Sequence, residues 1–108
     1  MDFSFDGHTI KTEFTGSKEH QGYANIVHGG IISTLLDEAM VKLAIAMDMP
    51  VVTAQMDIRL KKALTVGEKI IVTAAILKDT KKILEAHAKA VTEENVVIAE
   101  ATGKLVRI

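Results

Sequence analysis

The chain contains no cysteine, which excludes disulfide bonds, thiolate nucleophiles and cysteine-bound zinc. Any chemistry must therefore use oxygen and nitrogen atoms. Aromatic residues make up only 4% of the sequence, too few for a surface on which nucleic-acid bases stack. The 13 basic and 14 acidic residues are interspersed, so no field of one sign exists to hold a nucleic acid or an anionic membrane. We expect neither as a partner.

Long hydrophobic runs are absent as well. No apolar stretch reaches the roughly 18 residues of a membrane-spanning helix, and the start Met-Asp-Phe-Ser-Phe lacks the basic and apolar regions of a signal peptide. A cytoplasmic protein is the resulting expectation. The length of 108 residues suits one domain over residues 1–108. A mean hydropathy of +0.23 in so short a chain predicts an oligomeric interface.

The first half of the sequence predicts a hairpin and a helix. Residues 3–15 alternate between apolar and polar around Asp6-Gly7, a pattern typical of a β-hairpin. Residues 16–23 are polar and contain glycine, which indicates a loop. Residues 30–47 contain strong helix formers, no proline and apolar residues on almost every face. They predict a buried helix of roughly 27 Å.

Alternation returns after Pro50 and predicts a long strand over residues 52–61. Three more strands follow over residues 68–78, 82–92 and 96–108, and their short connections at 79–81 and 93–95 suit antiparallel hairpins in a meander. In the first of these four strands the apolar residues at even positions, from Val52 to Leu60, are expected to face the core. Thr53 and its odd-numbered neighbours are expected to face away.

Small residues line the later strands. Ala86, Ala88 and Ala90 share one face of the third strand, and the last strand offers Ala99, Ala101 and Gly103. Such rows let a bulky element approach closely, and the apolar helix is the bulky element available. The predicted fold class is therefore α+β, with one long buried helix wrapped by a strongly curved antiparallel sheet of about five strands.

Polar residues of the predicted helix form two stripes at i,i+4 spacing. Thr34, Glu38 and Lys42 form one, and the order of Glu38 and Lys42 favours an ion pair on a solvated edge. Ser33 and Asp37 form the other, and Asp37 has no cation one turn away. A carboxylate in an apolar helix costs stability unless it is paired or wet, and such groups are candidates for catalysis.

The alternative for Asp37 is structural. It would then pair with Arg59 or with a lysine of a neighbouring strand, and it would have no part in chemistry.

His28, Gly29 and Gly30 lie where the loop becomes the helix. Unpaired backbone N–H groups and the positive end of the helix dipole converge there, and glycine lets a ligand reach them. A carbonyl bound at this point would be polarised and its oxyanion stabilised. The competing interpretation is a turn made by two glycines, with His28 as the helix cap or as a hydrogen-bonding residue of the core. The remaining histidines show no metal-ligand spacing, so we expect no metal site.

The stretch HQGYANIVHGGIISTLLDEAM closely resembles the signature of the 4-hydroxybenzoyl-CoA thioesterase superfamily, in particular its phenylacetyl-CoA thioesterase-like (PaaI-like) branch. The shared features are His-Gly-Gly, the apolar helix, and an aspartate at the ninth position after the histidine. VVTAQMDIRLKKALTVGEKI and ATGKLVRI resemble the strand after the helix and the closing strand of the family. The resemblance covers nearly the whole chain and implies the hotdog fold.

The resemblance also implies roles for four residues. Gly29 would offer its backbone N–H to a thioester carbonyl, and His28 would support that site. Asp37, from the partner subunit, would act as nucleophile or as general base for water, and Thr53 matches a Ser or Thr position near the attacking water. The active site would lie at the interface of a homodimer, with a dimer of dimers (homotetramer) expected. No cofactor is implied, because CoA is part of the substrate.

Substrate contacts are expected around these four residues. Many relatives carry a polar residue six positions before the histidine, where this chain has Gly22, and they carry a proline where this chain has Lys62-Ala63. Gly30 is expected to contribute at the helix start. The candidates near Gly22 are Gln21, Tyr23 and Asn25, and the candidates for the CoA phosphates are Arg59, Lys61 and Lys62. Ordinary solvated side chains are the alternative for these three cations.

The leading hypothesis is hydrolysis of an acyl-CoA thioester by Asp37 with the Gly29 amide. The runner-up is a non-catalytic acyl-CoA-binding or sensor domain on the same fold, which would need no carboxylate beside the carbonyl. A hotdog hydratase or dehydratase is the third hypothesis. It would use His28 and Asp37 as an acid–base pair.

Overall fold

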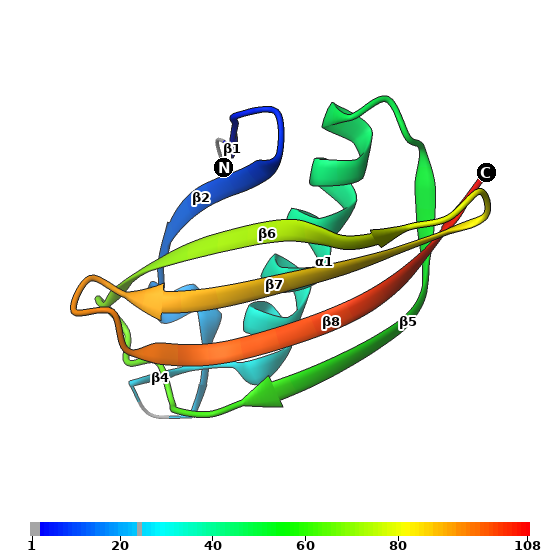
Figure 1. Cartoon of the computed structure of the whole chain (residues 1–108). Helices are drawn as coiled ribbons and strands as arrows, with labels where there is room; N and C mark the ends of the chain where they lie inside the picture. Colours follow the sequence, from blue (N-terminus) through cyan, green and yellow to red (C-terminus); the bar gives the residue numbers. More distant parts are fainter. Residues whose placement is uncertain (1–2, 24) are drawn as a thin grey trace.

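Helix α1 (Gly29–Ala46) lies against one face of an antiparallel sheet that curves around it (Figure 1). The computed structural model describes residues 3–23 and 25–108, and it describes the backbone alone for Lys18 and Tyr23. The sheet has six strands in the order β1-β2-β6-β7-β8-β5. They are β1 (Phe3–Phe5), β2 (Thr9–Thr15), β5 (Val51–Leu60), β6 (Lys69–Asp79), β7 (Ile83–Thr92) and β8 (Val97–Arg107). The predicted helix wrapped by an antiparallel sheet is confirmed.

The segment before α1 is more ordered than the predicted loop. A 3-10 turn, η1 (Lys18–His20), leads into β3 (Gln21–Tyr23), which pairs with β4 (Ile26–Val27) in a small second sheet. The N–H of His28 also donates to the carbonyl of His20 at 2.8 Å. These backbone bonds join residues that are close in sequence but show no apolar alternation, which is why composition alone predicts a loop.

The core lies between α1 and the concave face of the sheet. Leu36, Met40 and Leu43 on the helix are fully buried, and burial of a side chain of this size contributes about 1.5–3 kcal/mol. They rest on the predicted rows of small residues, because Ala86, Ala88, Ala90 and Ala99 have no exposed surface, and Ala101 has almost none.

At Gly103 on β8 the helix packs closely against the sheet. A methyl group added there would lie 3.0 Å from the terminal carbon of Met40. The rows of small residues therefore form the surface on which α1 packs, as the sequence predicts.

Strand β5 departs from its predicted alternation. Thr53 pairs with Leu105 and Gln55 with Lys104, so one extra residue forms a β-bulge at Ala54. Before the bulge, Val51 is buried and Val52 is 50% exposed. The predicted core-facing set from Val52 to Leu60 is thus wrong at its start. The bulge shifts the phase, so Thr53 faces α1 instead of facing away.

The same strand is an edge of the sheet. β5 pairs with β8 on one side, and within the described sheet no strand pairs with its other side. Ten residues long, it exposes Val52 and Leu60 by about half of their surface. A long edge with exposed apolar side chains is a ready template for pairing with another chain.

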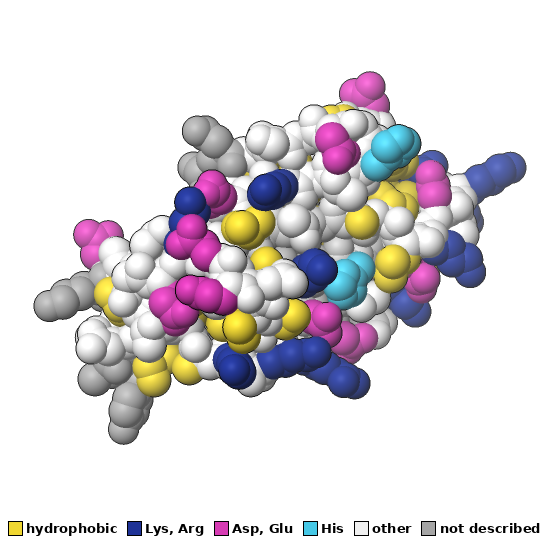
Figure 2. Space-filling model, turned by 60° about the vertical axis from the view of Figure 1, so that its left-hand side comes forward, with side chains coloured by type: hydrophobic (Ala, Val, Ile, Leu, Met, Phe, Trp, Pro, Cys, Tyr) yellow, Lys and Arg dark blue, Asp and Glu magenta, His cyan; other side chains and the backbone are white. Residues whose placement is uncertain are grey.

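Charges are mixed over the surface. Figure 2 shows basic and acidic side chains interspersed over one face, with small hydrophobic areas between them. The described residues form three ion pairs: Lys61–Glu100, Lys69–Glu13 and Arg107–Asp79. Within the part of the chain that the structure describes, no helix has the length and apolar character needed to cross a membrane.

The first hairpin turn depends on Asp6. Its carboxylate accepts hydrogen bonds from the N–H of Thr9 at 2.7 Å, the N–H of His8 at 2.9 Å and the hydroxyl of Thr9 at 2.8 Å. These bonds lower the pKa of Asp6 from 3.8 to about 2. The backbone N–H of Thr9 contributes most, followed by the backbone N–H of His8 and the hydroxyl of Thr9. Gly7 takes the positive φ of 101° that the turn needs.

We predict a matching pH dependence of the hairpin. Because the folded pKa of Asp6 lies below the unfolded value, its carboxylate stabilises the turn above about pH 4, and this contribution disappears as the pH falls through about 2. An NMR titration should place the Asp6 midpoint near 2, with faster amide exchange of His8 and Thr9 below it. Asp6→Asn should abolish the pH dependence, and a midpoint near 3.8 would contradict the prediction.

Candidate active site

The start of α1 leaves one backbone donor open. His28 is the N-cap, and its Nδ1 accepts the Gly30 N–H at 2.8 Å. The Ile31 N–H donates to the His28 carbonyl at 3.0 Å. The hydrogen bonds found within the described residues include none donated by the Gly29 N–H. The competing interpretation of His28 as a cap is thus confirmed. The cap engages the amide of Gly30 and not that of Gly29.

A groove of about 280 Å³ lies beside Gly29. Its lining is mostly apolar and comes from β4, the start of α1, the last residue of β5 and the segment after β5: Ile26, Val27, Gly29, Ile32, Leu60, Lys61, Lys62, Ala63 and Leu64. A methyl group added to Gly29 would lie 2.9 Å from Cδ1 of Leu60. The absence of a side chain at Gly29 therefore leaves room in the groove next to Leu60. Leu60 is not among the site residues that the sequence predicts, because its alternation pattern marks only a strand residue.

Asp37 is held by a hydroxyl group and not by a cation. The Thr53 Oγ1 donates to Asp37 Oδ1 at 2.6 Å, and both side chains are half-buried. The three ion pairs of the described residues do not include Asp37, so the structural alternative of pairing with Arg59 or a lysine is not seen. A short bond to a carboxylate of this kind is charge-assisted. It fixes one oxygen of Asp37 and leaves the other available.

The neighbouring polar stripe is solvated, as predicted. Thr34, Glu38 and Lys42 are exposed, but the ion pairs found in the described residues do not include the expected Glu38–Lys42 pair. Ser33 is half-buried beside Asp37, and its hydroxyl donates to the Gly29 carbonyl at 3.0 Å. The hydroxyl is thereby satisfied within the helix.

Gly29 and Asp37 lie apart within one chain. Eight residues along a helix correspond to roughly 12 Å. Their neighbours on β5 separate them further, because Leu60 lies against Gly29, whereas Thr53 binds Asp37. Seven residues of strand span roughly 23 Å. A carbonyl held by the Gly29 N–H of one chain is out of reach of direct attack by Asp37 of the same chain.

Gly22 lies beside His28. A methyl group on Gly22 would come within 2.8 Å of the His28 ring and 3.1 Å of the His28 Cα. The His28 ring therefore fills the space that a side chain at position 22 would need. Gln21 accepts the Asn25 N–H through Oε1 at 3.1 Å. Asn25 has a φ of 61° and shapes the turn between β3 and β4. The side chain of Tyr23 lies outside the described part of the structure.

The three predicted cations do not lie together. Lys61 and Lys62 line the groove beside Gly29. Lys61 pairs with Glu100 at 3.0 Å and lowers the pKa of that carboxyl. Lys62 takes part in no ion pair within the described residues and is the freer of the two.

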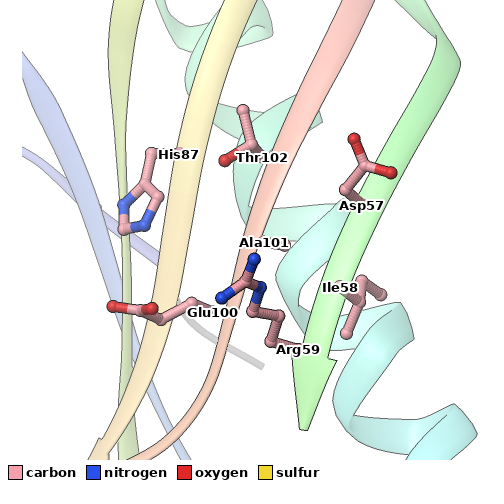
Figure 3. A pocket seen from close by; sticks show the side chains of 7 residues that line it. All are labelled: Asp57, Ile58, Arg59, His87, Glu100, Ala101 and Thr102. Carbon is pink, nitrogen blue, oxygen red and sulfur yellow. The ribbon is translucent and has the colours of Figure 1, made fainter.

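Arg59 lies elsewhere, in an open hollow of about 690 Å³ on the convex face of the sheet. Figure 3 shows it with Asp57 from β5, His87 from β7 and Glu100 from β8. Charges of both signs share this hollow, and it contains neither Gly29 nor Asp37. The structure therefore separates Arg59 from the groove.

The histidines other than His28 have separate surroundings. His20 packs against Phe14 with ring centroids 5.0 Å apart, and its Nδ1 accepts the Ser17 N–H at 3.1 Å. His87 lies in the convex hollow. Within residues 3–23 and 25–108, no three side chains of the His, Asp and Glu types are arranged to hold a metal ion.

Comparison with known proteins places this geometry in a family. The model of the family described as "Thioesterase superfamily" matches residues 24–99, more than half of the chain. No match was found among curated protein sequences.

Several solved structures share the fold. The smu.793 protein of Streptococcus mutans, bound to acetyl CoA, has a TM-score of 0.94 at 20% identity and covers 100% of this chain and 90% of its own. The E. coli PaaI protein from the phenylacetic acid degradation operon has a TM-score of 0.93 at 20% identity, with 98% and 82% covered. A hypothetical thioesterase of Streptococcus pneumoniae with coenzyme A has a TM-score of 0.94 at 16% identity, with 98% and 86% covered.

The wrapped helix is therefore the hotdog architecture of thioesterase structures. With the family model spanning the site from the His28 cap to Thr53 and beyond, the chain belongs to the thioesterase superfamily.

Proposed function

We propose that this protein is an acyl-CoA thioesterase that hydrolyses a thioester to a free acid and CoA. The observation that carries the proposal is the half-buried Asp37 carboxylate, which a 2.6 Å hydrogen bond from Thr53 orients and no described cation neutralises. A carboxylate kept in this state can attack an acyl carbon or take a proton from water. A domain that only binds acyl-CoA has no use for it. CoA-bound relatives of the same fold support the substrate class.

The Gly29 amide supplies the electrophilic half of the proposed reaction. The thioester carbonyl oxygen accepts the Gly29 N–H, at the positive end of the α1 dipole. Negative charge grows on that oxygen as the acyl carbon becomes tetrahedral, and a preorganised donor there lowers the barrier. The groove beside Gly29 receives the substrate next to the thioester, and Lys62 at its rim places a positive charge toward the CoA phosphates.

The proposed hydrolysis needs only the thioester, water and the residues of the site, without a cofactor. A water oxygen ends on the acyl carbon, either directly with Asp37 as base or after Asp37 has formed an acyl intermediate. The carbon–sulfur bond breaks, and the CoA sulfur leaves with a proton. Thr53 holds Asp37 in position by its hydroxyl donor. Both routes require the same placement of the carboxylate.

The two halves of the site come from two subunits in this proposal. Asp37 lies too far from Gly29 of its own chain for direct attack, since eight helical residues span roughly 12 Å. The free edge of β5, with Thr53 near one end and the exposed Leu60 at the other, offers a surface where a second copy can bind. A homodimer would then contain two identical sites, each with Gly29 of one subunit and Asp37 of the other.

Asp37→Asn should reduce turnover of acyl-CoA by about 10²-fold or more, because Asn keeps an acceptor for Thr53 but is neither base nor nucleophile. The measurement is release of free thiol from a panel of acyl-CoAs, with thermal unfolding to show that the fold is retained. Glu38→Gln is the matched control, since Glu38 is the adjacent, exposed carboxylate on α1. Near-normal hydrolysis by Asp37→Asn would refute the proposal, and tight binding of acyl-CoA by a wild-type protein without turnover would favour the sensor.

Gly29→Pro should remove the oxyanion donor and lower kcat by about 10²–10³-fold. Proline has no N–H and is well tolerated at the first helical position, where Gly29 lies. Gly29→Ala is the control, because alanine keeps the N–H while adding a similar contact with the flexible Leu60. Equal loss in the two variants would show that the wall of the groove matters and the amide does not.

Mixing the two inactive variants tests the shared site. Subunits of Asp37→Asn and Gly29→Pro, unfolded together and refolded at equal concentration, should recover about a quarter of wild-type activity, since half of the dimers are mixed and each has one intact site. Each variant refolded alone is the control. If both groups acted within one chain, every site in the mixture would carry a defect and no activity would return.

A further inference from the structure

Arg107, at the end of β8, joins three segments of the chain. Its Nη2 donates to the Asp79 carboxylate at the end of β6 and to the Met49 sulfur at 3.1 Å. Its Nη1 donates to the Lys81 carbonyl at 3.4 Å. Met49 lies in the connection between α1 and β5, and Lys81 lies in the turn between β6 and β7. Figure 1 shows that turn, the start of β5 and the C-terminus at the same end of the sheet.

One donor of the Arg107 guanidinium group is left over. Among the residues that the structure describes, Arg107 Nε is the only buried side-chain nitrogen or oxygen atom without a hydrogen-bond partner. A buried donor in this state costs free energy, so an acceptor that reached it would stabilise the fold. The Nε–H and one Nη2–H of a guanidinium group point in parallel along one edge. A single well-placed acceptor on that edge can therefore serve both nitrogens.

The Met49 sulfur is a weak acceptor held in a defined place. A thioether sulfur accepts only weak hydrogen bonds. The Met49 N–H donates to the Ala44 carbonyl at 2.8 Å, and the Ile108 N–H donates to the Pro50 carbonyl at 3.1 Å, so backbone bonds fix the connection at two points. The Met49 side chain is half-buried, which leaves a path for a small oxidant. An oxygen atom on the sulfur would lie one bond length away, beside the guanidinium group.

We propose that Met49 is a modification site where a peroxide forms a sulfoxide, and that Arg107 holds the sulfoxide oxygen through Nη2 and Nε. A lone pair of the sulfur attacks one oxygen of hydrogen peroxide. The sulfur–oxygen bond forms, the oxygen–oxygen bond breaks, and the second oxygen leaves as water with both protons. The sulfur is oxidised by two electrons and the peroxide is reduced. The inference does not rest on the proposed hydrolysis.

The other described methionines lack this partner. Met40 is fully buried and lies against Gly103, so a polar oxygen on its sulfur would disrupt the core. Met47 and Met56 are half-buried like Met49, but the hydrogen bonds found within the described residues include none donated to their sulfur atoms. Oxidation at Met49 is therefore the one that adds a strong hydrogen bond. The new bond ties the connection before β5 to the end of β8.

NMR spectroscopy of the wild-type protein tests the proposal directly. After brief treatment with hydrogen peroxide, peptide mass spectrometry should find one added oxygen on Met49. The Arg107 Nε–H signal should then shift downfield and exchange with water about tenfold more slowly, because the group gains an acceptor. An oxidised Met49 with an unchanged Arg107 Nε–H signal would overturn the proposal. So would a Met49 that stays unmodified while Met47 and Met56 take up oxygen.

Thermal unfolding supplies the matched variants. The change in Tm on oxidation is measured for the wild type, for Met49→Leu and for Arg107→Lys. Met49→Leu gives the effect of the other methionines, and the wild-type change should exceed it by about 4 °C or more. Arg107→Lys keeps a cation for Asp79 but has no pair of parallel N–H groups, so the excess should disappear. No excess in the wild type, or the same excess in Arg107→Lys, would contradict the assignment.

Discussion

The close packing of α1 against the sheet is the constraint on which the rest of the molecule depends. Ala86, Ala88 and Ala90 present no bulk to the helix, and a methyl group on Gly103 would already press on Met40. The helix can therefore lie deep in the curved sheet with Leu36 and Leu43 fully buried. Because the apolar faces of α1 pack against the sheet, the position of each polar residue of α1 relative to the core is fixed. Asp37 lies at the margin of the core, half in contact with solvent.

The margin of the core is also where β5 passes the helix. The bulge at Ala54 turns Thr53 inward, and its hydroxyl meets Asp37 at 2.6 Å. The hydrogen bond occupies one oxygen of this half-buried carboxylate, and none of the three ion pairs of the described residues includes Asp37. A buried ion pair would have stabilised the charge and removed its function. A hydroxyl partner is therefore consistent with the proposed role of Asp37.

Helix length imposes the other main limit on the site. α1 offers an open amide at its start and a carboxylate two turns later, and a rigid rod of roughly 12 Å keeps them apart. No adjustment of side chains in one chain brings both to one acyl carbon. The proposed activity therefore needs a second subunit, and the free edge of β5 is the exposed edge of the described sheet where another chain can pair.

What the sequence determined by itself is whatever depends on local pattern. The apolar segment ending before Pro50 specifies the helix, the alternating segments specify the strands, and the small residues show where helix and sheet meet. Asp37 is conspicuous because no cation lies one turn away. Only the tertiary structure decided that Thr53 faces Asp37, since one extra residue in β5 reverses an alternation whose period is two.

The tertiary structure likewise selected the Gly29 amide over that of Gly30, because the His28 ring folds back onto the latter. It also placed Lys62 in the groove and Arg59 on the opposite face of the sheet. Each of these outcomes depends on the direction in which a group points, and distant pairing sets that direction. Periodicity in the sequence identifies the elements and their buried faces, but hydrogen bonds between them decide which atoms are left for chemistry.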